Sequence, residues 1–162
     1  MLTAALLLGA AFAVTAAGAA TIVALGASNA AGQGVGADQA WPAQLERMLR
    51  AKGYNVNVVV NAVRGDTSAG ILSRVDSAVP AGTRAVVFDT GISNDRRKGV
   101  SPAESQANIA QIRARIRAHG ALPVMTSYAG VPSQDGVHST VAGHQMIAAR
   151  LVPQVSGVLK GR

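Results

Sequence analysis

The sequence predicts one α/β domain in which a short, mostly parallel sheet lies between two layers of helices, a three-layer α/β/α sandwich. Short apolar runs typical of buried strands alternate with longer segments whose apolar residues recur at helical spacing. Strands that are apolar on both sides must be covered on both faces of the sheet. A length of 162 residues is enough for one such core and short for two.

Four segments are predicted to be strands. Each is a short run rich in aliphatic residues and is followed by glycine or by polar residues; they cover residues 21–25, 56–60, 84–89 and 122–126. In a parallel sheet covered by helices, ligands bind where the strands end. The polar residues that directly follow these segments are therefore candidates for a functional site.

Four further segments are predicted to be helices, because their apolar residues share one helical face. They cover residues 38–52, 67–79, 101–120 and 141–159. The third opens with Ser101-Pro-Ala-Glu104, a capping box with proline at the first helical position.

The composition limits the chemistry that the chain can perform. There is no cysteine, which excludes disulfides, thiol nucleophiles and cysteine metal ligands. Apolar residues make up 49% of the chain but aromatic residues only 3%, so small and branched aliphatic side chains must build the core. No carboxylate–histidine cluster has the spacing of a metal site, and we expect no cofactor.

The first twenty residues carry no charge and end in small residues of the type that precede signal cleavage. We therefore expect a signal peptide over residues 1–19, cleaved near Ala19 or Ala20, with the domain over residues 20–162. An uncleaved membrane anchor is the alternative. In both cases the domain is expected outside the cytoplasm, either periplasmic or secreted.

The formal net charge is +7, and the basic residues are scattered except for the run Arg96-Arg97-Lys98. Such a surface favours anionic partners such as lipid headgroups or an envelope polysaccharide. Nucleic acid is not expected to be a partner, because aromatic residues are not interleaved with the basic ones and no reader motif is present.

Three residues suggest nucleophilic catalysis. Ser28 follows the first predicted strand, and Asp135 lies three residues before His138. Ser28 could attack a carbonyl group, His138 could accept its proton, and Asp135 could orient the imidazole. Gly65 and Asn94 follow other predicted strands, so the fold would bring them to the same edge of the sheet as Ser28.

These segments resemble the four motif blocks of the SGNH or GDSL-type serine hydrolases. The matching segments are Gly26-Ala27-Ser28, Asn61–Gly70, Gly91-Ile-Ser-Asn94-Asp95 and Asp135-Gly-Val-His138. The Asn61–Gly70 segment is particularly similar to the thioesterase/lysophospholipase branch. The resemblance extends over the chain after the signal segment and implies a flavodoxin-like fold.

The resemblance also implies roles for these residues. Ser28 would be the nucleophile of a catalytic triad with His138 and Asp135. The backbone N–H groups of Ser28 and Gly65, with the side-chain amide of Asn94, would form the oxyanion hole. The implied substrates are carboxylic esters or thioesters, above all lysophospholipids or simple short-chain acyl esters. A polysaccharide O-acetyl esterase and a non-catalytic envelope-binding protein on the same scaffold are the alternatives.

The chain departs from the family pattern at three places. Ala27 replaces an aspartate that is not the nucleophile, so we expect activity to survive. Ser93 is an extra residue between Gly91 and Asn94, which shifts the register of Asn94. The segment between the fourth predicted strand and Asp135 is short, which predicts a shallow pocket for short acyl groups.

Overall fold

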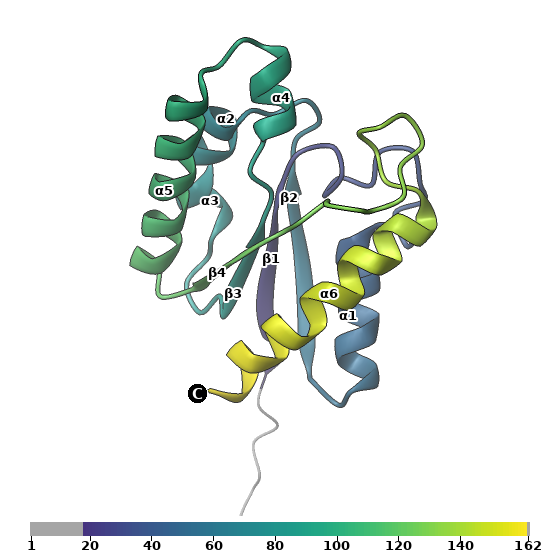
Figure 1. The fold of residues 1–162 in the computed structure, drawn as a ribbon. Coiled ribbons are helices and arrows are strands. Elements are labelled where there is room, and N and C mark those ends of the chain that lie inside the picture. The colour runs from purple at the N-terminus through teal and green to yellow at the C-terminus, as the bar shows by residue number, and fades with distance from the viewer. Residues whose placement is uncertain (1–17, 162) are drawn as a thin grey trace, which may run out of the picture.

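The structure is a computed structural model that describes residues 18–161 (Figure 1). Residues 1–17, most of the expected signal peptide, lie outside the described residues. The sheet has four parallel strands in the order β2-β1-β3-β4. They are β1 (Ala20–Gly26), β2 (Val56–Ala62), β3 (Ala85–Phe88) and β4 (Leu122–Met125). All four carboxyl ends therefore lie at one edge of the sheet, and the three-layer prediction is confirmed.

The helices cover both faces of the sheet and one of its ends. They are α1 (Trp41–Ala51), α2 (Ser68–Ser73), α3 (Val75–Ala78), α4 (Ile92–Arg97), α5 (Pro102–Ala118) and α6 (Val141–Lys160). Helices α1 and α6 pack on one face, and α2, α3 and α5 pack on the other. The short helix α4 and the loop before α6 lie at the carboxyl ends of the strands (Figure 1).

The core is divided by the sheet into two apolar clusters. Along β1, Ile22 and Ala24 face the first cluster while Val23 and Leu25 face the second, and all four are fully buried. Burying a valine, leucine or isoleucine side chain contributes about 1.5–3 kcal/mol. The central strands are thus held from both sides, as their apolar sequences predict.

The two edge strands are less covered than the sequence predicts. Val59 and Val60 on β2 and Leu122 and Met125 on β4 each remain 40–51% exposed. An edge strand has a neighbour on one side only, and helices cover these two incompletely. An apolar run therefore indicates a strand here without indicating its place in the sheet.

One predicted helical segment differs in detail from the observed structure. The helix predicted over 67–79 is two short helices, α2 and α3, which meet at Arg74. The Arg74 guanidinium donates to the Gly26 and Asn61 carbonyls and pairs with Asp66 at 2.7 Å. These contacts hold the ends of β1 and β2 against the loop that follows β2. The predicted N-cap is confirmed, because the Ser101 hydroxyl accepts from the Glu104 N–H at 3.2 Å and Pro102 follows at the first helical position.

The first turn of α1 is anchored by a buried histidine. The backbone N–H of Trp41 donates to His144 Nδ1 at 3.1 Å, and both residues are fully buried. Burial lowers the pKa of His144, so its imidazole is neutral and can accept this hydrogen bond. The contact joins α1 to α6.

Of the helices formed by residues 18–161, none has the length and apolar character required to cross a bilayer.

Candidate active site

A small cavity of about 90 Å³ lies at the carboxyl edge of the sheet, and we call it the Ser28 cavity. Its walls come from the ends of β1 and β3, from α4, and from the segments before α6. The lining residues are Ala27, Ser28, Asn29, Asp89, Gly91, Ser93, Asn94, Tyr128, Gly136 and Val137. Two predicted site residues, Ser28 and Asn94, therefore meet at one cavity, together with the backbone that precedes His138.

Ser28 is held in a tight turn directly after β1. Its side chain is almost fully buried, and its carbonyl accepts from the Gln33 N–H at 2.9 Å. The turn packs closely, because a Cβ atom on Gly26 would lie 2.8 Å from the Cβ atoms of both Ala30 and Asp89. Ala27 is also buried, where a small apolar side chain fits without needing a polar partner.

Asp135 and His138 form a hydrogen-bonded pair in the loop before α6. His138 Nδ1 lies 2.6 Å from Asp135 Oδ2, and Asp135 Oδ1 accepts the N–H groups of Val137 and His138 at 2.9 and 2.7 Å. The hydrogen bond from the His138 backbone N–H, followed by the one from its imidazole, holds the pKa of Asp135 well below its usual range. Because an ionised carboxylate only accepts, the Nδ1 atom carries the proton and Nε2 is left as the basic nitrogen.

Asn29 fastens this loop to the turn that carries Ser28. Its Nδ2 atom donates to the Val137 carbonyl at 2.9 Å, and its Oδ1 atom accepts from the Ser139 N–H at 2.9 Å. The two contacts fall on either side of His138. Asn29 is buried, so both ends of its amide need partners. Asn29 was not among the predicted site residues; its signal in the sequence is a polar side chain directly after Ser28.

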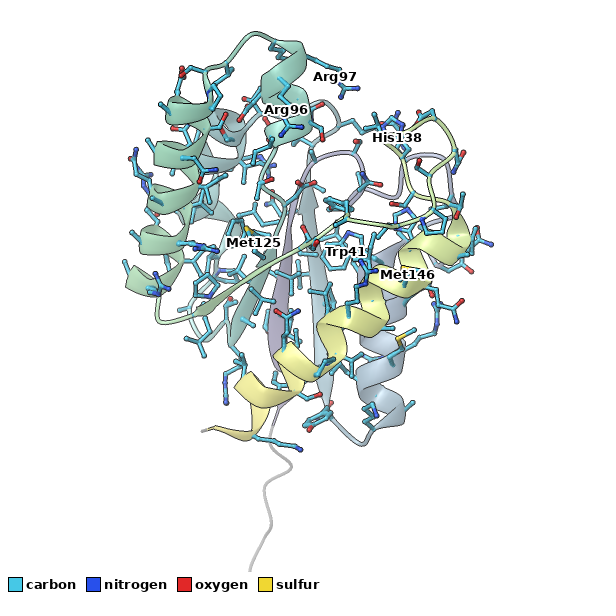
Figure 2. The ribbon with its side chains drawn as sticks, in the orientation of Figure 1. Trp41, Arg96, Arg97, Met125, His138 and Met146 are labelled. Carbon is cyan, nitrogen blue, oxygen red and sulfur yellow. The ribbon has the colours of Figure 1, made fainter. Side chains whose placement is uncertain are left out.

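Asn94 lies on α4 with its side chain buried. Its Nδ2 atom donates to the Asp66 carbonyl at 2.6 Å, and its Oδ1 atom accepts from Arg97. An amide nitrogen has two N–H groups, so one donor remains after the bond to Asp66. Figure 2 shows Arg97 and His138 at the same end of the molecule, on α4 and on the loop before α6.

Gly65 occupies a different position from the other predicted oxyanion residues. It is exposed, has a left-handed φ of 73°, and is absent from the described residues that line the Ser28 cavity. Its carbonyl accepts from Lys98 Nζ at 3.1 Å. Its neighbour Asp66 contacts the cavity lining, because the Asp66 carbonyl binds Asn94. Its role as an oxyanion donor stays a prediction.

Asp89 and Tyr128 form a polar wall of the cavity that the sequence analysis did not single out. The Tyr128 hydroxyl donates to Asp89 Oδ2 at 3.1 Å, and the Gly91 N–H donates to Asp89 Oδ1 at 3.1 Å. Burial raises the pKa of Asp89, and burial together with the Asp89 charge raises the pKa of Tyr128. The position of Asp89 at the end of β3 was the available signal. Among residues 18–161, no group of three or more His, Asp or Glu side chains could hold a metal ion.

The sequence of this chain is similar to those of several curated proteins. The chain is 36% identical over 101 residues to a protein named Esterase TesA from Pseudomonas aeruginosa. These aligned residues cover 62% of this chain and 50% of that protein. It is 32% identical over 111 residues to Thioesterase 1/protease 1/lysophospholipase L1 from Escherichia coli, covering 68% of this chain and 51% of the relative. The matches thus span about half the length of these curated relatives.

Solved structures share the fold. A crystal structure of TesA superposes with a TM-score of 0.70 at 26% identity, over 86% of this chain and 98% of that chain. AlinE4, an SGNH-hydrolase family esterase, superposes with a TM-score of 0.63 at 23% identity, over 88% of this chain and 75% of that chain. The model of the GDSL-like Lipase/Acylhydrolase family matches residues 24–151, which include Ser28, Asn94, Asp135 and His138. The chain belongs to this family.

Proposed function

We propose that the protein is a serine esterase that hydrolyses carboxylic ester or thioester bonds through a Ser28 acyl-enzyme. The observation that carries the proposal is the fixed pair of His138 and ionised Asp135 in a loop that Asn29 fastens to the Ser28 turn. A serine, a base and an orienting carboxylate are the groups that nucleophilic acyl transfer requires. Family membership and the esterase names of the relatives support the same interpretation.

The reaction follows from these groups. His138 Nε2 accepts the Ser28 hydroxyl proton as the serine oxygen attacks the carbonyl carbon. The negative charge on the carbonyl oxygen is stabilised by the N–H groups of Ser28 and Gly65 and by the free N–H of Asn94. His138 then protonates the departing alcohol or thiol. Water, deprotonated by His138, attacks the acyl-enzyme, and His138 returns this proton to the Ser28 oxygen as the carboxylic acid leaves; Asp135 holds the imidazole throughout.

Short acyl groups are the proposed acyl half of the substrate. The Ser28 cavity has a volume of about 90 Å³, whereas pockets for drug-sized ligands have about 300–1,000 Å³. Asp89 and Tyr128 make one wall polar, which disfavours a long alkyl chain. Simple short-chain esters therefore rank ahead of lysophospholipids. The same small cavity supports a polysaccharide O-acetyl esterase as the second candidate.

Hydrolysis of p-nitrophenyl acetate, butyrate and octanoate by the wild type and by Ser28→Ala tests the proposal. We expect kcat/KM to fall as the acyl chain lengthens, and turnover to vanish in Ser28→Ala. A preference for octanoate would contradict the short-acyl assignment. Turnover that is equal in both proteins, or absent from both folded proteins, would favour the alternative of a binding protein for an anionic envelope polymer.

A location outside the cytoplasm is proposed from the uncharged residues 1–19 and the small residues around Ala19 and Ala20. A signal peptide predicts that the protein recovered from the periplasm or medium begins near Ala20. Mass measurement of the expressed protein tests this. A full-length mass in the membrane fraction would instead support the anchor.

A further inference from the structure

A second, larger cleft adjoins the Ser28 cavity. It has a volume of about 720 Å³, within the range of pockets that hold small molecules, and lies between α4, α5 and the segment that follows β4. Ser93 and Tyr128 line both the cleft and the Ser28 cavity. A molecule whose acyl group fills the small cavity can therefore extend into the cleft past these two residues.

The cleft combines apolar walls with two guanidinium groups. Ile109 and Met125 supply apolar surface, Arg96 enters from α4, and Arg113 enters from α5. Figure 2 labels two of the lining residues, Arg96 on α4 and Met125 at the end of β4. No carboxylate is among the cleft's described lining residues. The cleft thus pairs positive charge with apolar surface.

The charges of Arg96 and Arg113 are not neutralised within residues 18–161. Neither side chain is in an ion pair there, and the polar contact of Arg113 is to Met125 Sδ at 3.7 Å. Other arginines differ: Arg74 pairs with Asp66 at 2.7 Å and Arg115 with Asp76 at 2.9 Å. Two uncompensated guanidinium groups in one cleft attract a carboxylate or phosphate, whose oxygens match the guanidinium fork.

We propose that this cleft binds the leaving-group half of the ester, and that this half carries an anionic group, a carboxylate or a phosphate. The inference rests on the proposed esterase function, because it places the acyl half in the Ser28 cavity. The ester oxygen then lies at the shared wall of Ser93 and Tyr128. The apolar part of the leaving group contacts Ile109 and Met125, and its anion meets Arg96 and Arg113.

Three acetate esters test the proposal: neutral phenyl acetate, 4-acetoxybenzoate and 4-acetoxyphenyl phosphate. They are compared in the wild type, in Arg96→Gln and in Arg113→Gln. Arg117→Gln is the matched control, because Arg117 is an exposed residue one turn further along α5 and outside the cleft. The intrinsic reactivities of the esters cancel when the anionic-to-neutral ratio of kcat/KM is compared between proteins.

The ratio should fall roughly two- to fivefold in each cleft variant, as expected for a partly exposed charge pair, and stay unchanged in Arg117→Gln. Added salt should lower the wild-type ratio towards that of the variants. The ester with the larger response identifies the anion as carboxylate or phosphate. Equal ratios in the wild type and both cleft variants would overturn the proposal.

A binding measurement separates this inference from the esterase proposal. Binding of 4-acetoxybenzoate and 4-acetoxyphenyl phosphate to Ser28→Ala is measured by calorimetry, alone and combined with Arg96→Gln or Arg113→Gln. Weaker binding in the combined variants supports the anion site even if no ester is hydrolysed, in which case only the esterase proposal fails. Affinity for both anions that does not depend on either arginine would overturn the anion site.

Discussion

The half of the Ser28 cavity proposed to carry the nucleophile is tied to the His138 loop through the buried side chain of Asn29, whereas the half proposed to carry the oxyanion donors is tied to the Gly65 loop through one N–H of Asn94. In the nucleophile half, Asn29 binds the backbone on both sides of His138, and Asp135 binds the imidazole. In the oxyanion half, one Asn94 N–H donates to the Asp66 carbonyl, and Gly65, the neighbour of Asp66, lies exposed outside the cavity lining. Two hydrogen bonds from one buried amide thus hold the backbone beside His138 to the Ser28 turn, whereas one hydrogen bond from Asn94 holds the loop of Gly65.

This difference has a physical origin. The nucleophile half connects segments far apart in the chain through a buried amide, and leaving either end of that amide unpaired is costly. The loop of Gly65 is held to α4 by one buried and one exposed side chain, Asn94 and Lys98. Substitutions in the two halves should consequently differ in how they divide their effect between turnover and stability.

Asn94→Ala is expected to produce the largest effect in this comparison. Losing one oxyanion donor costs about 10²–10³-fold in kcat, because the donor acts on charge that develops in the transition state. Steady-state kinetics with p-nitrophenyl acetate measure it. Asn108→Ala is the matched control: Asn108 is also a buried asparagine, bonded to the Ser68 hydroxyl at 3.0 Å, but it does not line the cavity. An equal loss of kcat in both variants would contradict a direct role for Asn94.

Asn29→Ala should lower both turnover and stability. Without the amide, the loop that carries His138 is no longer held at Ser28, and displacement of a catalytic group by about 1 Å can cost about 10²-fold. We expect kcat to fall about 10- to 100-fold with KM little changed. The unpaired Ser139 N–H should lower the free energy of unfolding by about 1–3 kcal/mol. If Asn29→Ala loses stability but keeps its kcat, Asn29 has a purely structural role.

The sequence was most informative where the functional groups are close in the chain. The three-residue spacing of Asp135 and His138 predicts their contact, because both side chains lie in one short loop. Asn29 could not be found this way, since its partners are 108 and 110 residues away. The strands, and the polar residues that follow them, were predictable from apolar runs. The break between α2 and α3 at Arg74 was not, because it depends on carbonyl groups that only the folded sheet brings together.

Two glycines test the packing of the oxyanion half. Gly65 and Gly91 both have left-handed φ angles, 73° and 71°. A Cβ atom on Gly65 would meet nothing within 4 Å, so Gly65→Ala should cost only the conformational penalty of about 1–2 kcal/mol. A Cβ atom on Gly91 would lie 2.5 Å from the Ser68 backbone nitrogen, which cannot move freely. Denaturant unfolding should find Gly91→Ala clearly less stable than Gly65→Ala. Equal losses would mean that the oxyanion half is loosely packed.

The smallest expected effect is the pH dependence of the stability that Asp135 contributes. Its pKa is lowered in the folded protein, so its stabilising contribution is present above the ordinary carboxyl pKa and is lost as pH falls through the lower folded value. The difference in melting temperature between wild type and Asp135→Asn should be constant from pH 7 to pH 5 and shrink towards pH 2. It should stay small, because the Asp135 side chain is half exposed. A difference that grows on acidification would contradict the ionised pair.

The most direct test of the account is covalent labelling of Ser28 by a fluorophosphonate, followed by peptide mass spectrometry. The phosphorus centre reacts with an activated serine without requiring knowledge of the natural ester. An activated Ser28 should give one adduct, on Ser28, which is absent in Ser28→Ala and at least tenfold slower to form in His138→Ala. No adduct on folded wild type, or labelling at the same rate without His138, would contradict an activated nucleophile at this site.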